Sequence, residues 1–210
     1  MLTIDQARQW YPDSDPIHGF DHIQRVVATA GCIAEMEGAD QEIVRYAALL
    51  HDASPVKAER HNHHLSSSEF AGEILTQLGW EPARIAAVQH CIRAHRFRDD
   101  SEQPQTLEAK ILFDADKLDA IGAIGVARAI AYAARAGQPA YAPPSASFLE
   151  TGQLEPGEPH SAYHEYIFKL SRLKQRIYTA AAARIADERH AFMQEFFQRL
   201  ASEMNGIGEK

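Results

Sequence analysis

The chain has 210 residues and a formal net charge of −8. This acidic balance argues against a broad surface for nucleic acid polymers or anionic lipid, because such surfaces depend on clustered Lys and Arg. Hydrophobic residues make up 45% of the chain, which is enough for the core of one globular domain. Because the chain is acidic, a substrate that carries phosphate would need a metal ion or a few local cations.

Nothing in the sequence directs export or membrane insertion. Cys32 and Cys91 lie in apolar helical sequence without CxxC spacing, which disfavours a disulfide or a thiolate zinc site. The first residues lack a basic segment followed by an apolar stretch, and no later segment approaches the length of a membrane span. We expect a cytoplasmic protein with no membrane partner.

Apolar residues recur at helical spacing along almost the whole chain, which predicts an all-α fold. Thr3 to Gln6 has the form of a capping box and opens a short helix that ends before Pro12. The next predicted helix runs from about His18 to Glu37 and stops at Gly38. Asp40 is then placed to cap a third helix.

The third predicted helix carries its apolar stripe up to His51-Asp52. Ser66 to Glu69 repeats the capping-box pattern and is expected to start a helix that ends at Gly79. Pro82 is well placed to open the following helix, which leads to His95 and a charged loop. A further helix, continued by an Ala-rich segment, reaches about residue 137.

The last third of the chain begins with a segment rich in proline. Residues 138–159 contain five prolines, which indicates a long loop that either covers a site or only connects helices. Residues 160–204 are expected to form one long helix or a broken pair. We therefore predict a single domain over 1–210, with a core at about 18–137 and the C-terminal region packed on it. A monomer and a homodimer both agree with this pattern.

Eleven histidines are present, and their positions matter more than their number. His18 and His22 lie one helical turn apart, and an isolated pair of this kind is more often the polar edge of a helix. The dipeptide His51-Asp52 changes that balance, because it follows an apolar run at the end of a core helix. A carboxylate there is costly to desolvate unless it is paired or binds a cation.

A third element is the segment FDADKLDAIG, with Asp114, Asp116 and Asp119 in otherwise apolar helical sequence. Asp116 and Asp119 share a helix face, and Asp114 points elsewhere. A solvated helix face would explain one of these acids but not all three. Two imidazoles and two carboxylates form a mixed ligand set that suits Mn²⁺, Fe or Zn²⁺, and less often Mg²⁺.

The order of these residues resembles the H…HD…D pattern of HD-domain phosphohydrolases. The resemblance covers roughly residues 15 to 204 and is specific to the small bacterial HD hydrolases that include nucleotide pyrophosphohydrolases. Its segments are HGFDHIQRV, AALLHDAS, ILFDADKLDAIGAIGVAR and TAAAARIADERHAFMQEF. It implies an HD-domain-like helical bundle.

The resemblance also implies a ligand set for one divalent metal ion. The implied ligands are His22, His51, Asp52 and Asp116, and Asp114 competes for the last place. Mn²⁺ is the first candidate, with Mg²⁺, Fe, Zn²⁺, Ni²⁺ and Co²⁺ as the others.

Some members of the superfamily bind a second ion through extra histidines. His90 and His95 occupy the matching interval, but helix geometry sets them about 140° apart, so we expect His95 alone to serve the site. A group of three histidines after the HD pair belongs either to a solvated loop or to the mouth of the site. These are His61, His63 and His64.

The expected chemistry is hydrolysis of a phosphate ester by a metal-activated water. Asp52 would bind the metal and orient the water, and His95 or Asp119 would assist proton transfer to the leaving oxygen. Lys117 and Arg25 could offset phosphate charge, or could be ordinary salt-bridge partners.

We therefore expect a metal-dependent phosphohydrolase of nucleotides or related phosphate esters, with pyrophosphate release from nucleoside triphosphates as the finer expectation. A phosphodiesterase is the enzymatic alternative. A metal-stabilised binding or signalling domain without turnover is the alternative from another class. An HD-domain oxygenase is more remote, because it requires additional iron ligands.

Overall fold

The structure is a computed structural model of the full chain, and it describes residues 2–11, 19–53, 63–96 and 102–206. These residues form helices and connecting segments with no strand among them, so the all-α prediction is confirmed. Within the same ranges, no helix is both long and apolar enough to cross a lipid bilayer. The chain divides into two compact units, Met1–Asp116 with Tyr178–Ala182 and Lys117–Ile177 with Ala183–Lys210. The predicted packing of the C-terminal region on the core stays a prediction.

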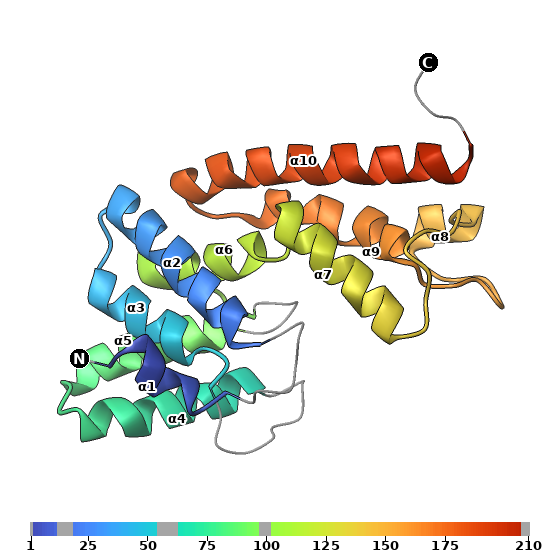
Figure 1. Ribbon diagram of the computed structural model, residues 1–210. Helices are drawn as coiled ribbons and strands as arrows, with labels where there is room; N and C mark the ends of the chain where they lie inside the picture. The colour runs from blue at the N-terminus through green and yellow to red at the C-terminus, as the bar shows by residue number, and fades with distance from the viewer. Residues whose placement is uncertain (1, 12–18, 54–62, 97–101, 207–210) are drawn as a thin grey trace. The chain divides into compact units, whose positions relative to one another are not determined.

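The helices of the first unit follow one another in the order shown in Figure 1. They are α1 (Ile4–Arg8), α2 (Phe20–Glu37), α3 (Gln41–Leu50), α4 (His63–Gln77), α5 (Pro82–Ala94) and most of α6 (Leu107–Leu118). Thr3 and Gln6 form the predicted capping box, and Asp40 accepts hydrogen bonds from the first backbone N–H groups of α3. Gly38 ends α2 in the left-handed conformation, with φ of 72°. The capping predictions for α1, α2 and α3 are thus confirmed.

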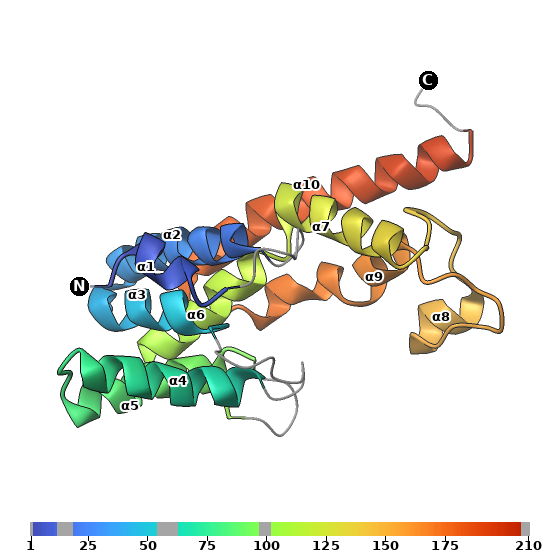
Figure 2. The same ribbon diagram turned by 60° about the horizontal axis from the view of Figure 1, so that its bottom comes forward.

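The predicted start of α4 was wrong. The helix begins at His63, so Ser66 lies inside it and does not cap it. Ser68 of this helix belongs instead to the α4–α5 interface, where it is buried and its carbonyl accepts a hydrogen bond from Gln89 Nε2 at 3.0 Å. A Cβ atom at Gly72 would lie 2.4 Å from the same Nε2 atom. Small residues therefore let α4 and α5 lie side by side (Figures 1 and 2).

Helix α3 lies at the centre of the first unit, where it packs against α2 and α5. Its last turns are fully buried, and Ile111, Leu112 and Phe113 of α6 are equally inaccessible. Two tyrosine hydroxyls bind the N-terminal segment to α3. The Tyr46 hydroxyl accepts from the backbone N–H of Leu2 at 2.9 Å, and the Tyr11 hydroxyl donates to the Leu49 carbonyl at 2.7 Å. Both ends of the short α1 segment are thereby held against the helix that carries the HD pair.

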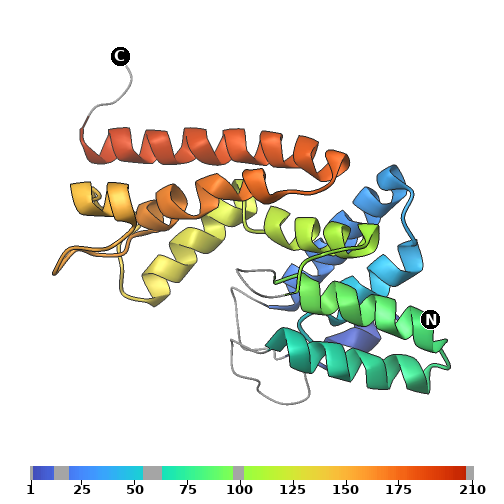
Figure 3. The same cartoon turned by 180° about the vertical axis from the view of Figure 1, so that it is seen from behind.

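The second unit contains α7 (Gly122–Arg135), α8 (Ala146–Thr151), α9 (Ala162–Phe168), η1 (Leu170–Arg176) and the larger part of α10 (Ala180–Met204) (Figure 3). The last third of the chain is thus broken, which is one of the two predicted arrangements. The prediction of a loop throughout 138–159 was wrong at α8, because Ser145 caps this short helix and Phe148 buries its ring. Tyr166 of α9 stacks on Phe197 of α10 with ring centroids 4.4 Å apart.

Candidate metal centre

His51 lies at the C-terminal end of α3 and is completely buried. Its Nδ1 atom is 2.8 Å from the Ala48 carbonyl oxygen, one turn back on the same helix. Because a carbonyl only accepts hydrogen bonds, Nδ1 carries the proton and Nε2 keeps its lone pair. Among the described residues, this buried Nε2 has no hydrogen-bond partner. A buried lone pair of this kind is costly, and a bound cation would satisfy it.

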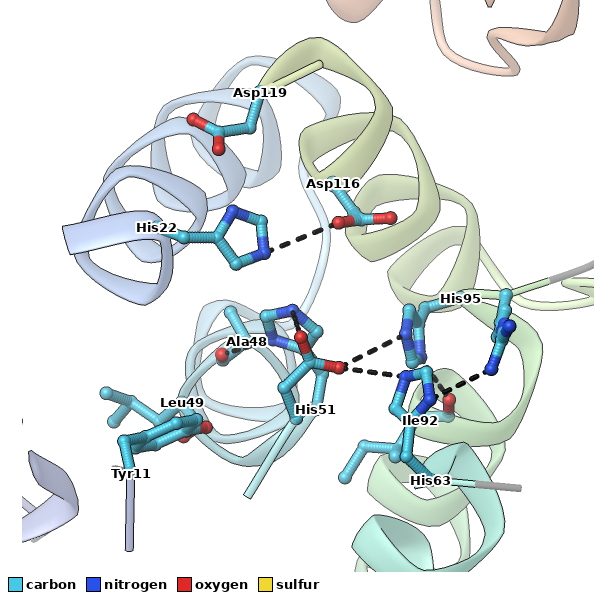
Figure 4. Close-up of polar contacts among 12 residues, drawn as sticks. Tyr11, His22, Ala48, Leu49, His51, His63, Ile92, His95, Asp116 and Asp119 are labelled. Atoms are coloured by element: carbon cyan, nitrogen blue, oxygen red, sulfur yellow. Dashed lines mark hydrogen bonds and ion pairs between the residues drawn. The ribbon is translucent and has the colours of Figure 1, made fainter. Parts of the chain in front are cut away.

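His22 lies close to His51 and Asp52, and Asp116 lies beside His22. His22 lies in the first turn of α2 and is 4% exposed, and its Nε2 is 3.5 Å from Asp116 Oδ1 (Figure 4). His22, His51 and Asp52 each offer one ligand atom within 4.8 Å of the others. Bonds of about 2.0–2.2 Å to one ion separate its ligands by at most about 4.4 Å. A small movement would therefore bring these atoms into a common coordination sphere.

Asp52 lies between two groups of histidines. Its side chain is 32% exposed, and its Oδ1 atom is 3.1 Å from His63 Nε2 and 3.7 Å from His95 Nε2. Burial alone would raise the pKa of the carboxyl. The neighbouring imidazoles of His51, His63 and His95 oppose this effect and hold the pKa of Asp52 well below its ordinary value. The group stays ionised and can serve as a ligand.

The two histidines of α5 have different surroundings. His95, at the end of the helix, is 3% exposed, and its Nδ1 lies 2.5 Å from the Ile92 carbonyl. Its Nε2 therefore carries a lone pair on the side of Asp52. His90 contacts the segment after α5, with Nδ1 at 2.5 Å from Glu102 and Nε2 accepting from the backbone N–H of Gln105. The structure brings His95 to the cluster and leaves His90 outside it.

Asp114 and Asp116 are separated by their hydrogen bonds. Asp114 is fully buried, and its two oxygens accept from Tyr178 N at 2.9 Å and from Thr179 N and Oγ1, both at 2.8 Å. Burial raises the pKa of Asp114 even though these hydrogen bonds oppose the shift. The carboxylate thus fixes the segment that precedes α10. Asp116, in contrast, faces His22.

The remaining predicted site residues lie in varied surroundings. Arg25 forms an ion pair with Asp21, one turn away, at 2.5 Å. Lys117 and Asp119 belong to the second unit, where the buried Asp119 binds Arg128 NH1 at 2.5 Å. The roles predicted for Arg25, Lys117 and Asp119 stay predictions. Two further histidines, His18 and His61, lie outside the described residues.

Two residues near the cluster gave no signal in the sequence. Tyr11 donates to the Leu49 carbonyl, two residues before His51, and burial raises the pKa of its hydroxyl well above the ordinary value, so it stays a donor. Arg96 donates through NH1 to His63 Nδ1 at 2.9 Å. Tyr11 lies outside every motif in the sequence. Arg96 directly follows His95, but only the folded chain pairs it with a residue 33 positions earlier.

A helical unit that gathers His22, the His51-Asp52 pair and Asp116 has the features of an HD domain. The HD domain model matches residues 19–121. The chain is also 35% identical over 214 residues to YpgQ of Bacillus subtilis, an alignment that covers 99% of this chain and 96% of YpgQ. The chain therefore belongs to the HD domain family, and the resemblance found in its sequence is confirmed.

Solved structures of relatives have the same fold. The crystal structure of Bacillus subtilis YpgQ in complex with ADP matches with a TM-score of 0.74 and 33% identity, over 98% of this chain and all of the other. A Bacillus thuringiensis protein described as an HD-superfamily hydrolase matches with a TM-score of 0.70 and 28% identity, over 96% of each chain. The family thus includes proteins described as hydrolases and one relative with a bound nucleotide.

Proposed function

We propose that the protein is a metal-dependent phosphohydrolase that acts on nucleotides or related phosphate esters through a metal-activated water. The observation that carries the proposal is the buried Nε2 of His51. The hydrogen bond at Nδ1 fixes the proton there and leaves the lone pair on Nε2. This Nε2 atom lies close to Asp52 and His22. A nitrogen and oxygen donor set of this kind fits a divalent ion.

In this proposal His22, His51, Asp52 and Asp116 hold the ion, and Mn²⁺ is the first candidate. A divalent ion bound there would lower the pKa of a water molecule near the phosphate and polarise a phosphate oxygen. Asp52 orients the attacking water through its carboxylate. His95, whose proton on Nδ1 is held by Ile92, is placed beside Asp52 and is our first candidate for assisting proton transfer.

Asp119 is the second candidate for that proton transfer. Its ion pair with Arg128 makes it the weaker one, because the guanidinium stabilises the ionised carboxylate. Lys117 and Arg25 are proposed to bind the phosphate groups. In a chain of net charge −8, such local cations are needed to hold an anionic substrate.

The substrate class rests on the relatives. YpgQ was crystallised with ADP, and this chain matches that structure over almost its whole length. We therefore propose a nucleotide as the small-molecule partner, with release of pyrophosphate from a nucleoside triphosphate as the finer proposal. No polymeric nucleic acid is expected, because clustered surface cations are required for such binding.

A product analysis tests the proposal. The protein is incubated with nucleoside mono-, di- and triphosphates and with cyclic and linear diesters, in Mn²⁺, Mg²⁺ or Co²⁺, and the products are followed by ³¹P NMR. We expect pyrophosphate or phosphate release from nucleotides by the unmutated protein and none by His51→Ala. The exposed His160 gives a matched control in His160→Gln. Cleavage of diesters alone would indicate a phosphodiesterase, and no product in any metal would leave a binding domain.

A further inference from the structure

We infer that Arg96 fixes the tautomer of His63 and so prevents a second metal ion from binding beside Asp52, which leaves a centre with a single ion. This inference rests on the proposed metal centre at His22, His51 and Asp52. It concerns a neighbouring group of atoms that could bind metal, on Asp52, His63 and His95.

That neighbouring group has the composition of a metal site. Asp52, His63 and His95 each offer one ligand atom, and these atoms lie within 4.8 Å of one another. The rings of His63 and His95 lie 5.7 Å apart between centroids. By spacing alone, Asp52 could bridge two ions, one in each group. The hydrogen bonds at Nδ1 of each ring decide whether Nε2 has a lone pair, and so whether both histidines can be ligands.

His51 and His95 share one arrangement. In each, Nδ1 lies against the backbone carbonyl three residues earlier, at 2.8 Å from Ala48 and 2.5 Å from Ile92. A carbonyl accepts hydrogen bonds only, so the proton is on Nδ1 and the lone pair is on Nε2. This is the tautomer that a metal ligand needs when it binds through Nε2.

His63 has the opposite arrangement. Arg96 NH1 lies 2.9 Å from its Nδ1, and a guanidinium has N–H donors but no acceptor. Every form of the ring with a proton on Nδ1 is therefore disfavoured. The proton is therefore on Nε2, which lies 3.1 Å from Asp52 Oδ1. The His63 ring therefore presents an N–H group, and not a lone pair, to the place beside Asp52 where a second ion would bind.

A second ion would thus have to break the contact between Arg96 and His63. It would also have to bind across the ring from a guanidinium of the same sign of charge. Of the three described residues in this group, Asp52 and His95 would be left as ligands. Two protein ligands are fewer than the three that typical catalytic zinc sites use.

The tautomers can be measured in the full-length, metal-free protein. Long-range ¹H–¹⁵N correlation spectra distinguish the two neutral forms of each ring, and a His63→Phe spectrum assigns the resonances. We expect the proton on Nε2 in His63 and on Nδ1 in His95. A proton on Nδ1 of His63 would overturn the inference without any reference to a bound metal.

The number of bound ions is then counted by elemental analysis after equilibrium dialysis against Mn²⁺. We expect one ion in the unmutated protein, two in Arg96→Met, and one again in the double variant Arg96→Met with His63→Phe. Arg96→Lys is the matched control, because it keeps a cationic donor, and it should bind one. Circular dichroism confirms that each variant is folded.

The outcomes separate the two proposals. Two ions in the unmutated protein, or one in folded Arg96→Met, would overturn the role of Arg96 and leave the metal centre intact. No bound ion in any variant would overturn the metal centre and the single-ion count together.

Discussion

Asp114 and Asp116 lie two residues apart on α6 and differ in every contact that matters for their roles. Asp114 accepts three hydrogen bonds from Tyr178 and Thr179, and Asp116 faces His22. We expect Asp114→Ala to destabilise the metal-free protein by about 2–4 kcal/mol, because buried N–H groups lose their acceptor. Urea unfolding measures this change.

We expect Asp116→Ala to weaken metal binding and to leave the stability of the metal-free protein almost unchanged. We expect little change in the unfolding free energy of the metal-free protein, within about 1 kcal/mol, and a loss of Mn²⁺ affinity of more than about 100-fold. That loss exceeds the 10–100-fold typical of groups that only orient a ligand. Isothermal titration calorimetry measures the affinity. If Asp114→Ala abolished Mn²⁺ binding in a folded protein and Asp116→Ala did not, the assignment would be reversed.

Tyr11 gives a second prediction about a single side chain. Tyr11→Phe keeps the ring beside Phe20 and removes only the hydroxyl that donates to the Leu49 carbonyl. We expect a loss of about 0.5–1.5 kcal/mol in the free energy of unfolding, the usual value for one hydrogen bond. Tyr141→Phe is the control, because that hydroxyl has a 3.4 Å contact with exposed Asn205. Equal losses in both variants would contradict a specific role for Tyr11.

For single side chains, the sequence predicts the candidate ligand residues better than it predicts their hydrogen-bond partners. The four proposed ligands were expected from residue types and the motif. The choice between Asp114 and Asp116 depends on Tyr178 and Thr179, 64 and 65 residues away in sequence. No periodicity records such a contact, because it exists only once the chain has folded.

Glu158 holds the segment that contains α8. Its carboxylate accepts from Ser145 N at 2.6 Å, Ser145 Oγ at 2.8 Å and Glu155 N at 2.7 Å, and it lies 3.0 Å from His164 Nε2. The hydrogen bond from the Glu155 backbone is the largest of the effects that lower the pKa of Glu158 to about 2. The segment is therefore held by an ionised carboxylate.

This arrangement predicts a pH dependence. The folded-state pKa is below the ordinary value of 4.5, so the stabilisation is present above that value and is lost as pH falls toward about 2. The difference in melting temperature between the unmutated protein and Glu158→Gln should be greatest above about pH 5.5 and should shrink on acidification. Differential scanning calorimetry at several pH values measures it. A difference that does not vary with pH would contradict the role of the ionised group.

The elements also show where local signals succeed. The capping residues Thr3 and Asp40 act within three residues of their helices, so the sequence alone predicts them. The start of α4 was missed because Ser66 matches a cap locally, whereas it lies inside a helix whose Ser68 contacts α5. The break before α10 was one of two predicted arrangements. Its position depends on the contact between Asp114 and Thr179, which local sequence does not record.

For the whole molecule, metal binding and stability should be linked. The proposed buried ligands, such as His51, whose Nε2 has no described hydrogen-bond partner, are expected to favour the metal-bound folded state. At a free Mn²⁺ concentration of about 100 times the dissociation constant, we expect a stabilisation of about 2.7 kcal/mol. Thermal unfolding with and without Mn²⁺ measures this increment. His51→Ala should lose it, and His160→Gln should keep it.

The central claim is that nucleotide hydrolysis depends on an ion held by this cluster. The most direct test is the initial rate of nucleotide hydrolysis by chelator-treated protein as a function of added Mn²⁺, measured in parallel for Asp52→Ala. We predict no turnover without metal, a saturable return of activity in the unmutated protein, and a rate at least about 1,000-fold lower in Asp52→Ala, equivalent to about 4 kcal/mol of barrier. Undiminished turnover in the metal-free protein or in Asp52→Ala would contradict the claim.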